Sequence, residues 1–283
     1  MTEILRLSAF AAAPGGGNPA GVVLDAGGLS DTLMQQIAAE VGYAESAFVT
    51  SPVPASGVRK VSVRYFSPIA EVPFCGHATV AAAVALAQLH GPGSFVFQTM
   101  VGDVLLEAAP GQEGIEVSFT SVDPVVELLP EADLDAILNL LQLHRSDLAD
   151  HYPPRLAFAG NPHPVLVLAD AASFDSFSFD PEAMRGLMDR RGWTGTVTLL
   201  RSLSAHEFEA CNLFPVGDLV EDPATGSAAA SVGAYLRELQ LIDVPAEIVI
   251  RQGRHIGRPS VLRVQVPLAG GITVSGGAIR IED

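Results

Sequence analysis

The sequence "VPFCGHATVAAA" (residues 72–83) contains the start of the helix that decides how this chain folds. From His77 onward, "HATVAAAVALAQL" is apolar on nearly every side of a predicted helix. A helix without a polar face must be buried all round. Short β-branched runs separated by Gly and Pro make up much of the remaining chain, which is typical of strands. We therefore predict a curved sheet wrapped around this helix.

The chain contains a second copy of this stretch. "EDPATGSAAASVG", from Glu221, repeats "EVPFCGHATVAAA", from Glu71, at an offset of 150 residues that also separates Gly76 from Gly226. Three further pairs follow in the same order, and four ordered pairs indicate an internal duplication. These pairs are "GYAESAFV" with "GWTGTVTL", "LSDTLMQQIAAEVGY" with "SFDPEAMRGLMDRRGW", and "GNPAGVVL" with "GNPHPVLVL". In the first pair Glu45 is aligned with Gly195.

The duplication predicts an α+β protein with two pseudo-symmetric lobes. Residues 1–118 form the expected N-terminal lobe and residues 119–283 the C-terminal lobe, with the last strand free to cross back to the first lobe. Each lobe is expected to be a β-barrel-like sheet around one central, buried helix. An amphipathic helix over residues 31–41, with Leu33, Ile37 and Val41 on its apolar side, is expected outside that arrangement.

The net charge of the chain and the lengths of its apolar runs argue against nucleic-acid and membrane partners. The 32 acidic and 16 basic residues give a formal net charge of −16, which argues against nucleic acid or an anionic membrane. The apolar runs are far shorter than a membrane span of about 20 residues. The N-terminus lacks the pattern of a secretory signal, and two cysteines do not suggest a disulfide framework. We expect a cytoplasmic protein whose partner is a small molecule.

The starts of the two buried helices are candidate anion sites. The first backbone N–H groups of a helix have no partner within it, and the helix dipole favours a negative charge there. Gly76 and Gly226 allow a ligand to approach the backbone closely. We expect the two starts to face each other and to bind a carboxylate. Alternatively, His77 and Ser227 simply cap their helices.

Cys75 has three possible roles. A two-thiol racemase needs a second thiol at the repeat position, which is Thr225, and Cys211 lies 14 residues before it. A metal site would use His77 at a spacing of two, but no further Cys or His nearby completes a tetrahedral set. We therefore expect Cys75 to be a small buried residue before a turn, and no metal.

Each lobe has one carboxylate that the other lacks. Glu45 opens an apolar strand, and Asp222 has Val72 as its repeat partner. A glutamate in apolar surroundings has a raised pKa and can serve as a general acid or base near neutral pH. The alternatives are a solvated residue at a helix end for Glu45 and a turn residue before Pro223 for Asp222.

Four motifs together resemble the PhzF-like phenazine biosynthesis isomerase family: "GNPAGVV", "YAESAF", "PFCGHATVA" and "EDPATGSAA". The resemblance covers essentially the whole chain. It implies the diaminopimelate epimerase-like fold, no metal, no organic cofactor and a homodimer. It also implies Glu45, His77 and Asp222 as catalytic residues, and Gly76, Gly226, Ser227 and Asn18 as substrate-binding residues.

These observations predict a cofactor-independent isomerase or epimerase that moves a proton on a small, cyclic or open-chain, carboxylic acid. The alternatives are a catalytically silent small-molecule-binding protein on the same fold and a two-base amino-acid racemase. His163 and His255 are expected at turns or on the surface. Nothing in the spacing places Arg254 and Arg258 near an acidic ligand.

Overall fold

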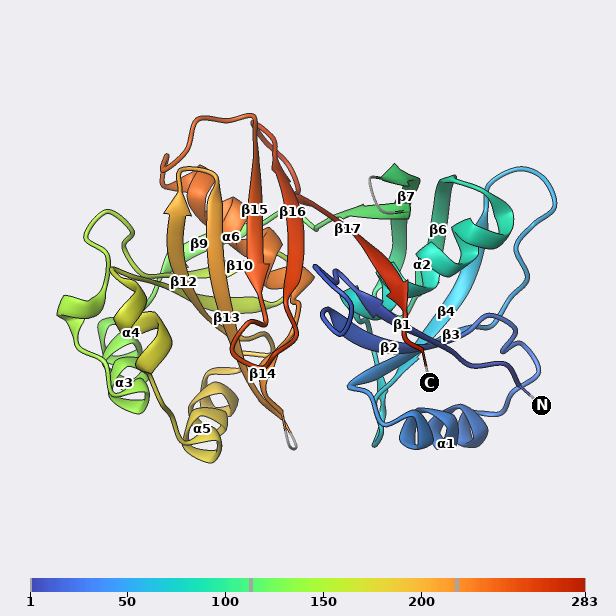
Figure 1. Cartoon of the computed structure of the whole chain (residues 1–283), viewed down its shortest axis with the longest axis horizontal. Coiled ribbons are helices and arrows are strands. Elements are labelled where there is room, and N and C mark those ends of the chain that lie inside the picture. Colours follow the sequence, from blue (N-terminus) through green and yellow to red (C-terminus); the bar gives the residue numbers. More distant parts are fainter. Residues whose placement is uncertain (1, 112–113, 217–218, 283) are drawn as a thin grey trace. The chain divides into compact units, whose positions relative to one another are not determined.

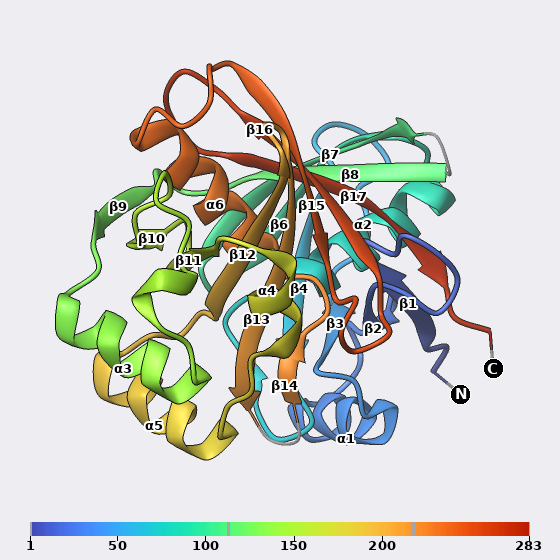
Figure 2. The same cartoon turned by 60° about the vertical axis from the view of Figure 1, so that its left-hand side comes forward.

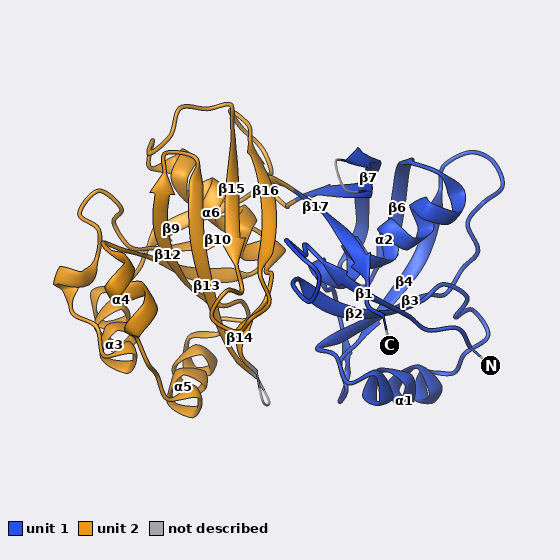
Figure 3. Ribbon diagram, in the orientation of Figure 1, with its two compact units in different colours: residues 1–120, 275–283 blue, residues 121–274 orange. Residues whose placement is uncertain are grey.

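A computed structural model describes residues 2–111, 114–216 and 219–282 of the chain. The chain divides into two compact units (Figure 3). Unit 1 comprises residues 1–120 and 275–283, and unit 2 comprises residues 121–274. The segment that returns to unit 1 contains most of the last strand.

Unit 1 is a closed barrel of eight strands. Its strands pair in the cyclic order β1, β2, β3, β4, β6, β7, β8, β17 and back to β1. The short strand β5 (Glu71–Val72) pairs with the end of β4. The barrel strands are β1 (Leu5–Ala9), β2 (Asn18–Val23), β3 (Glu45–Val49), β4 (Lys60–Phe66), β6 (Gly93–Thr99), β7 (Gly102–Gly111), β8 (Gly114–Thr120) and β17 (Thr273–Arg280).

Helix α2 (Gly76–His90) lies inside this barrel (Figures 1 and 2). It contacts β1, β2, β3, β7 and β8, and every residue from His77 to Ala87 is buried. Six of those eleven residues are alanine, which lets the strands approach the helix closely. The sequence prediction of a helix enclosed by a curved sheet is confirmed for this unit.

Unit 2 repeats the same order of pairing. Strand β9 pairs with β10, followed by β11, β12, β13, β15 and β16, while β14 pairs with the end of β13. Helix α6 (Gly226–Glu238) contacts β9, β10, β11 and β16. The strands are β9 (Val125–Leu128), β10 (Arg155–Phe158), β11 (Pro162–Leu168), β12 (Val197–Ser204), β13 (Glu207–Val216), β14 (Leu219–Asp222), β15 (Ala246–Gln252) and β16 (Ser260–Val266).

The duplication is visible in the strand directions. Strands β2 and β3 are parallel, as are β11 and β12, and the same holds for β4 with β6 and β13 with β15. The remaining pairs that the two units share are antiparallel. Parallel neighbours need a crossover connection. Helix α1 (Asp31–Val41) lies in this connection in unit 1, and α5 (Pro181–Arg191) lies in it in unit 2.

The register corrects one detail of the repeat alignment. Ser46 lies opposite Phe66 in unit 1, and Val197 lies opposite Leu213 in unit 2. Because Phe66 and Leu213 face the matched glutamates of β5 and β14, Ser46 corresponds to Val197. The structural counterpart of Glu45 is therefore Thr196. The alignment with Gly195 was wrong by one residue, because unit 2 has one more residue between its crossover helix and the next strand.

The other helices pack outside the sheets. Helix α1 (Asp31–Val41) buries Met34, Ile37 and Ala38, whereas Leu33 is 40% exposed. The buried side of the helix therefore includes Ile37, as predicted, but not Leu33. In unit 2, α3 (Glu131–Leu141), α4 (Ala171–Ser176) and α5 (Pro181–Arg191) share a core with β11, β12 and β13 (Figure 2). Among the described residues, no helix combines the length and apolarity that crossing a membrane requires.

Candidate active site

Glu45 opens strand β3, directly after the turn that ends α1. That helix stops at Gly42, which adopts a left-handed conformation as its C-cap. The next four residues of β3, Ser46 to Val49, are buried in unit 1. Glu45 is therefore the last polar position before the core, and its side chain is 20% exposed.

The start of α2 places Cys75 and His77 beside this carboxylate. Cys75 is the N-cap residue, with an extended backbone and no side-chain capping bond. The Thr79 hydroxyl donates to the Cys75 carbonyl at 2.7 Å, and Tyr65 donates to Thr79 at 2.6 Å. Because Tyr65 and Thr79 are fully buried, this chain of hydrogen bonds fixes the first turn of α2.

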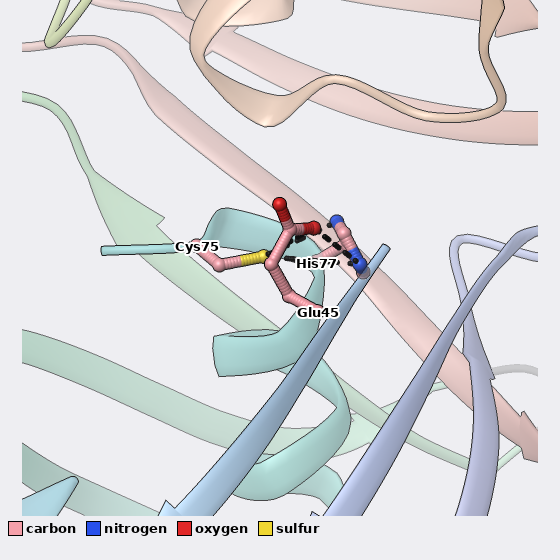
Figure 4. Close-up of side chains that lie close together, drawn as sticks. All are labelled: Glu45, Cys75 and His77. Carbon is pink, nitrogen blue, oxygen red and sulfur yellow. Dashed lines mark hydrogen bonds and ion pairs between the residues drawn. The ribbon is translucent and has the colours of Figure 1, made fainter. Parts of the chain in front are cut away.

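The three side chains form a compact cluster, defined here as the Glu45 cluster (Figure 4). The Cys75 thiol donates to Glu45 Oε2 across 3.5 Å, and the same oxygen lies 3.6 Å from His77 Nε2. The Cys75 Sγ is 3.3 Å from His77 Nδ1. Strand β3 and helix α2 thus bring together residues 30 positions apart in the sequence.

Burial sets the protonation states in the cluster. It raises the pKa of Glu45, and the hydrogen bond from Cys75 offsets part of that rise. Burial lowers the pKa of His77 to about 4, while a hydrogen bond to the Pro19 carbonyl opposes the shift. His77 is therefore neutral at pH 7, and its contact with Glu45 is not an ion pair. A carboxylate with a raised pKa beside a neutral imidazole can accept and return a proton.

The structure gives Cys75 a larger role than the sequence indicated. Cys75 is buried, as expected, but its sulfur contacts the candidate base and its histidine neighbour. Glu45, Cys75 and His77 also present three potential metal ligands within 4.8 Å of one another. The sequence showed only two of them, because the third comes from a distant strand. A cation bound there would consume the basicity of Glu45, so the two uses exclude each other.

Asn18 and Gly76 lie in the same unit as this cluster. Asn18 begins β2 and is 1% exposed. Its turn requires Gly17, whose φ is +78° and where a Cβ would lie 2.6 Å from the Ala9 carbonyl oxygen. At Gly76, by contrast, a Cβ would make only an ordinary 3.7 Å contact with Phe119. The surrounding protein therefore does not demand glycine at the start of α2.

In unit 2, Asp222 belongs to a hydrogen-bonded turn before α6. The Thr225 hydroxyl donates to the Asp222 carboxylate. The Gln252 side chain donates to the Asp222 carbonyl at 2.6 Å and accepts from the Thr225 amide at 3.2 Å. The end of β15 thus holds the turn from Asp222 to Thr225 against the helix start.

Ser227 contacts His163, which the sequence predicts at a turn or on the surface. His163 is fully buried in β11, not at the surface, and its Nε2 lies 3.0 Å from Ser227 Oγ. The Thr196 amide donates to His163 Nδ1 at 2.9 Å, so Nε2 carries the proton and donates to Ser227. Burial lowers the pKa of His163 to about 4, which keeps it neutral. Ser227 can therefore direct its own hydroxyl proton to a ligand.

A positional signal for His163 was present in the sequence. It follows the second "GNP" turn and corresponds to Ala20 after the first. The asymmetry of that pair resembles the asymmetry that singled out Glu45. His255 does lie at an exposed turn, as expected.

The predicted site residues fall into two groups. Glu45, His77, Gly76 and Asn18 belong to unit 1, whereas Asp222, Gly226 and Ser227 belong to unit 2. Within unit 1, Glu45 and His77 are in contact. Within unit 2, Gly226 begins the helix that carries Ser227, directly after the Asp222 turn. That the two groups bind one substrate stays a prediction.

Comparisons with known proteins give a consistent picture. Residues 7–282 match the family model of phenazine biosynthesis-like proteins, PhzC-PhzF. The uncharacterized isomerase YddE of Escherichia coli O157:H7 is 31% identical, covering 98% of this chain and 95% of that protein. The trans-2,3-dihydro-3-hydroxyanthranilate isomerase of Pseudomonas chlororaphis is 29% identical over 93% of this chain and 89% of its own length.

A solved structure is similar to this chain in both fold and sequence. The structure of the predicted epimerase PA4716 from Pseudomonas aeruginosa matches with a TM-score of 0.85 and 29% sequence identity. The match covers 100% of this chain and 98% of that protein chain. More distant solved structures share the fold alone. The expected diaminopimelate epimerase-like fold is confirmed.

Proposed function

Because this chain belongs to the phenazine biosynthesis-like (PhzC-PhzF) family and is an isomerase, we propose that it moves a proton between two carbon atoms of a small carboxylic acid, with no cofactor taking part in the reaction. The observation that carries the proposal is the Glu45 cluster. It contains a partly buried carboxylate with a raised pKa, in contact with a thiol and a neutral imidazole.

Glu45 acts first as base and then as acid. Its carboxylate removes a proton from an acidic C–H group, and the electron pair of that bond delocalises into the conjugated substrate. The resulting carboxylic acid is 20% exposed and can exchange its proton with water, and it delivers a proton to another carbon, so that substrate and product are isomers. The thiol of Cys75 and the ring of His77 hold the Glu45 carboxylate in one orientation during both steps. Positioned acid–base catalysis of this kind contributes about 10²–10⁴ to a rate.

The substrate carboxylate is the proposed ligand of Ser227 and the start of α6. His163 donates to Ser227, which supports this role because the Ser227 hydroxyl proton is then directed away from the histidine. The N-terminal amides of α6 add a partial positive charge suited to an anion. Asp222, tied to Thr225 and Gln252, is proposed to orient a polar substituent or an amine of the substrate.

The relative from Pseudomonas chlororaphis suggests where to look for the substrate. Its name describes an isomerase of a dihydro-hydroxyanthranilate, which is a cyclic amino acid with a conjugated ring. We propose that this chain acts on cyclic carboxylic acids of similar size. Candidate acids can be ranked by thermal shift, because a ligand that binds only the folded state raises the melting temperature.

Deuterium exchange tests the assignment of Glu45. The protein is incubated in D₂O with each acid that binds, and deuterium at carbon is followed by NMR. We expect incorporation with the wild type and a rate lower by about 10²–10⁴ in Glu45→Gln, with binding retained. Glu40→Gln, at an exposed position of α1, is the matched control and should exchange normally.

The same experiment separates the alternative functions. Normal exchange in Glu45→Gln would disprove the role of Glu45. A silent binding protein would bind an acid without exchange in the wild type as well. A two-base racemase that uses Cys75 would lose all exchange in Cys75→Ser, whereas a thiol that only orients Glu45 should leave measurable exchange in that variant.

A further inference from the structure

A second cluster of potential ligands lies in unit 2, outside the groups described above. Cys211 on β13, Glu221 on β14 and His255 in the turn after β15 each offer one donor atom, and these atoms lie within 4.8 Å of one another. Cys211 is 1% exposed and Glu221 is 6% exposed. We name these three residues the Cys211 cluster.

The duplication supplies an internal comparison for this cluster. In unit 1, Glu71 lies opposite Phe66, and Arg64 stands two residues before Phe66. In unit 2, Glu221 lies opposite Leu213, and Cys211 stands two residues before Leu213. Cys211 therefore occupies the position of Arg64.

That exchange leaves the glutamate with weaker partners, because the Cys211 thiol and the Gly253 amide donate to its carboxylate in place of a guanidinium. Arg64 Nε and Nη2 each donate to one Glu71 oxygen at 2.7 Å. In unit 2 a thiol replaces this guanidinium, and Glu221 Oε1 is buried with no hydrogen-bond partner. A buried carboxylate oxygen without a partner is costly, so the site favours an added positive charge.

The charged groups around the cluster do not fully offset this cost, because Arg254 and His255 attract the Glu221 carboxylate but burial still raises its pKa. Arg201 and Arg254 both donate to Glu209, and Arg254 also donates to Asp175. These two cations are thus matched by two carboxylates, which leaves the charge of Glu221 in excess. A divalent cation bound by one carboxylate and one thiolate would make the group neutral.

His255 is the third potential ligand of the cluster. Its Nε2 lies 3.0 Å from Asp175 Oδ1 and 3.3 Å from Arg254 Nη2. When the neutral ring donates to the carboxylate, its lone pair is on Nδ1. A carboxylate behind a histidine is a common second partner in zinc sites. The rings of Phe174 and Phe177 pack against His255. The His255 side chain is 24% exposed, so an ion can reach the cluster from solvent.

We propose that Cys211, Glu221 and His255 bind a zinc-like divalent ion. Zinc accepts thiolate, imidazole and carboxylate ligands at about 2.0–2.3 Å, so two ligands of one ion lie at most about 4.6 Å apart. The observed spacing needs only small side-chain adjustments to reach that value. The ion would deprotonate the thiol and tie β13, β14 and the turn after β15 together. Its fourth ligand would be a water molecule.

Cobalt titration tests this proposal. Chelator-treated full-length protein is titrated with Co²⁺, and the thiolate-to-cobalt charge-transfer absorption is recorded. Zn²⁺ is then added to displace the cobalt. We expect one Co²⁺ per chain with this absorption, retained in Cys75→Ser, which removes the thiol of the Glu45 cluster. Cys211→Ser should abolish it.

Because Cys211 is buried, Cys211→Ser could lose cobalt binding simply by misfolding. A second set of variants, at accessible positions, tests the site independently. His255→Ala, at an accessible position, should weaken binding at least about 100-fold, and His206→Ala, at an exposed turn of the same unit, should leave it unchanged. Asp175→Asn should weaken binding about 10–100-fold. The proposal is overturned if the absorption is absent from the wild type, survives Cys211→Ser, is lost in Cys75→Ser, or is unaffected by His255→Ala.

Discussion

At the scale of single residues, unit 1 keeps Glu45 in a position that favours its neutral form. The carboxylate stands at the boundary between a solvated turn and the buried part of β3. Burial raises its pKa, which is useful for proton transfer and unfavourable for the ionised folded state. The proposed proton transfer and the stability of the folded state therefore make opposite demands on this residue.

Glu45→Gln should stabilise the protein at neutral pH. A carboxyl group whose folded-state pKa lies above its unfolded value costs stability as pH rises through these two values. Removing the charge should raise stability by about 0.5–2 kcal/mol at pH 8, a typical gain at a functional site. The gain should vanish below the unfolded pKa of 4.5. Urea denaturation at several pH values measures it, and a wild type more stable than Glu45→Gln at pH 8 would contradict this account.

His163 should make unit 2 sensitive to acid. Its pKa falls from 6.5 in the unfolded chain to about 4 in the folded one, so unfolding takes up a proton between these values and stability is lost as pH falls through that window. Asn at this position cannot titrate, so His163→Asn should flatten the profile. It should also cost about 1–3 kcal/mol at pH 7, because buried hydrogen bonds are lost.

Trp193 makes this measurement specific to unit 2. It is the single tryptophan of the chain and is buried in the core of that unit. His206→Asn, at an exposed position, provides the control. An equally steep acid profile in His163→Asn would show that other groups dominate the acid response.

The sequence predicted individual site residues only where the two repeats carry different residue types at matching positions. Glu45 stood out because its strand is otherwise apolar, and Asp222 because its partner is Val72, which the pairing of the strands confirms. His163 was misplaced because its hydrogen bonds come from Thr196 and Ser227, which are 33 and 64 residues away. Contacts at such separations depend on strand register, which a pairwise alignment does not provide.

At the scale of elements, the two buried helices achieve close packing in different ways. Helix α2 uses alanine at most of its core positions, whereas α6 has Gly233 where α2 has Ala83. A Cβ at Gly233 would lie 2.9 Å from Ile272 Cγ2 and 3.0 Å from Val264 Cγ1. The sequence predicted both helices from their missing polar face. It could not show which of them touches the sheet most closely, because that distance is set by side chains of other strands.

Gly233→Ala should therefore destabilise the protein, although alanine is the better helix former. Propensity alone would add about 1 kcal/mol of stability. Overpacking typically costs about 1–3 kcal/mol and should dominate, because branched side chains surround the site. The matched control is Gly186→Ala in α5, where a Cβ meets only the flexible end of Arg190 at 3.3 Å. That variant should be neutral or stabilised. Thermal denaturation of both decides the point, and a stabilised Gly233→Ala would refute the packing argument.

At the scale of the whole chain, the last strand completes the first unit. Strand β17 pairs with β1 and β8, and Phe10 packs over Gly276, where a side chain would collide with the ring. The repeat predicts two lobes that divide after residue 118, and the two compact units divide between Thr120 and Ser121. Which strand closes a barrel depends on pairing over more than 260 residues, and local patterns carry little information about it.

Ending the chain at residue 274 should disrupt unit 1 more than unit 2. Strands β1 and β8 would lose their shared partner and present unpaired edges, which promotes aggregation. Trp193 fluorescence should still report a cooperative transition of unit 2, while circular dichroism should show loss of ordered strands. A chain ending at Ile281 keeps β17 and serves as control. Undiminished cooperativity by both probes in the shorter chain would contradict this expectation.

The return of β17 to unit 1 also constrains biosynthesis. A ribosome makes β1 to β8 first, then the whole of unit 2, and only afterwards the strand that joins β1 to β8. Unit 2 can fold as soon as its own residues have emerged, whereas the first barrel must wait with two open edges. The Glu45 cluster, although encoded within the first 77 residues, therefore lies in a barrel that can close only after the whole of unit 2 has been synthesised.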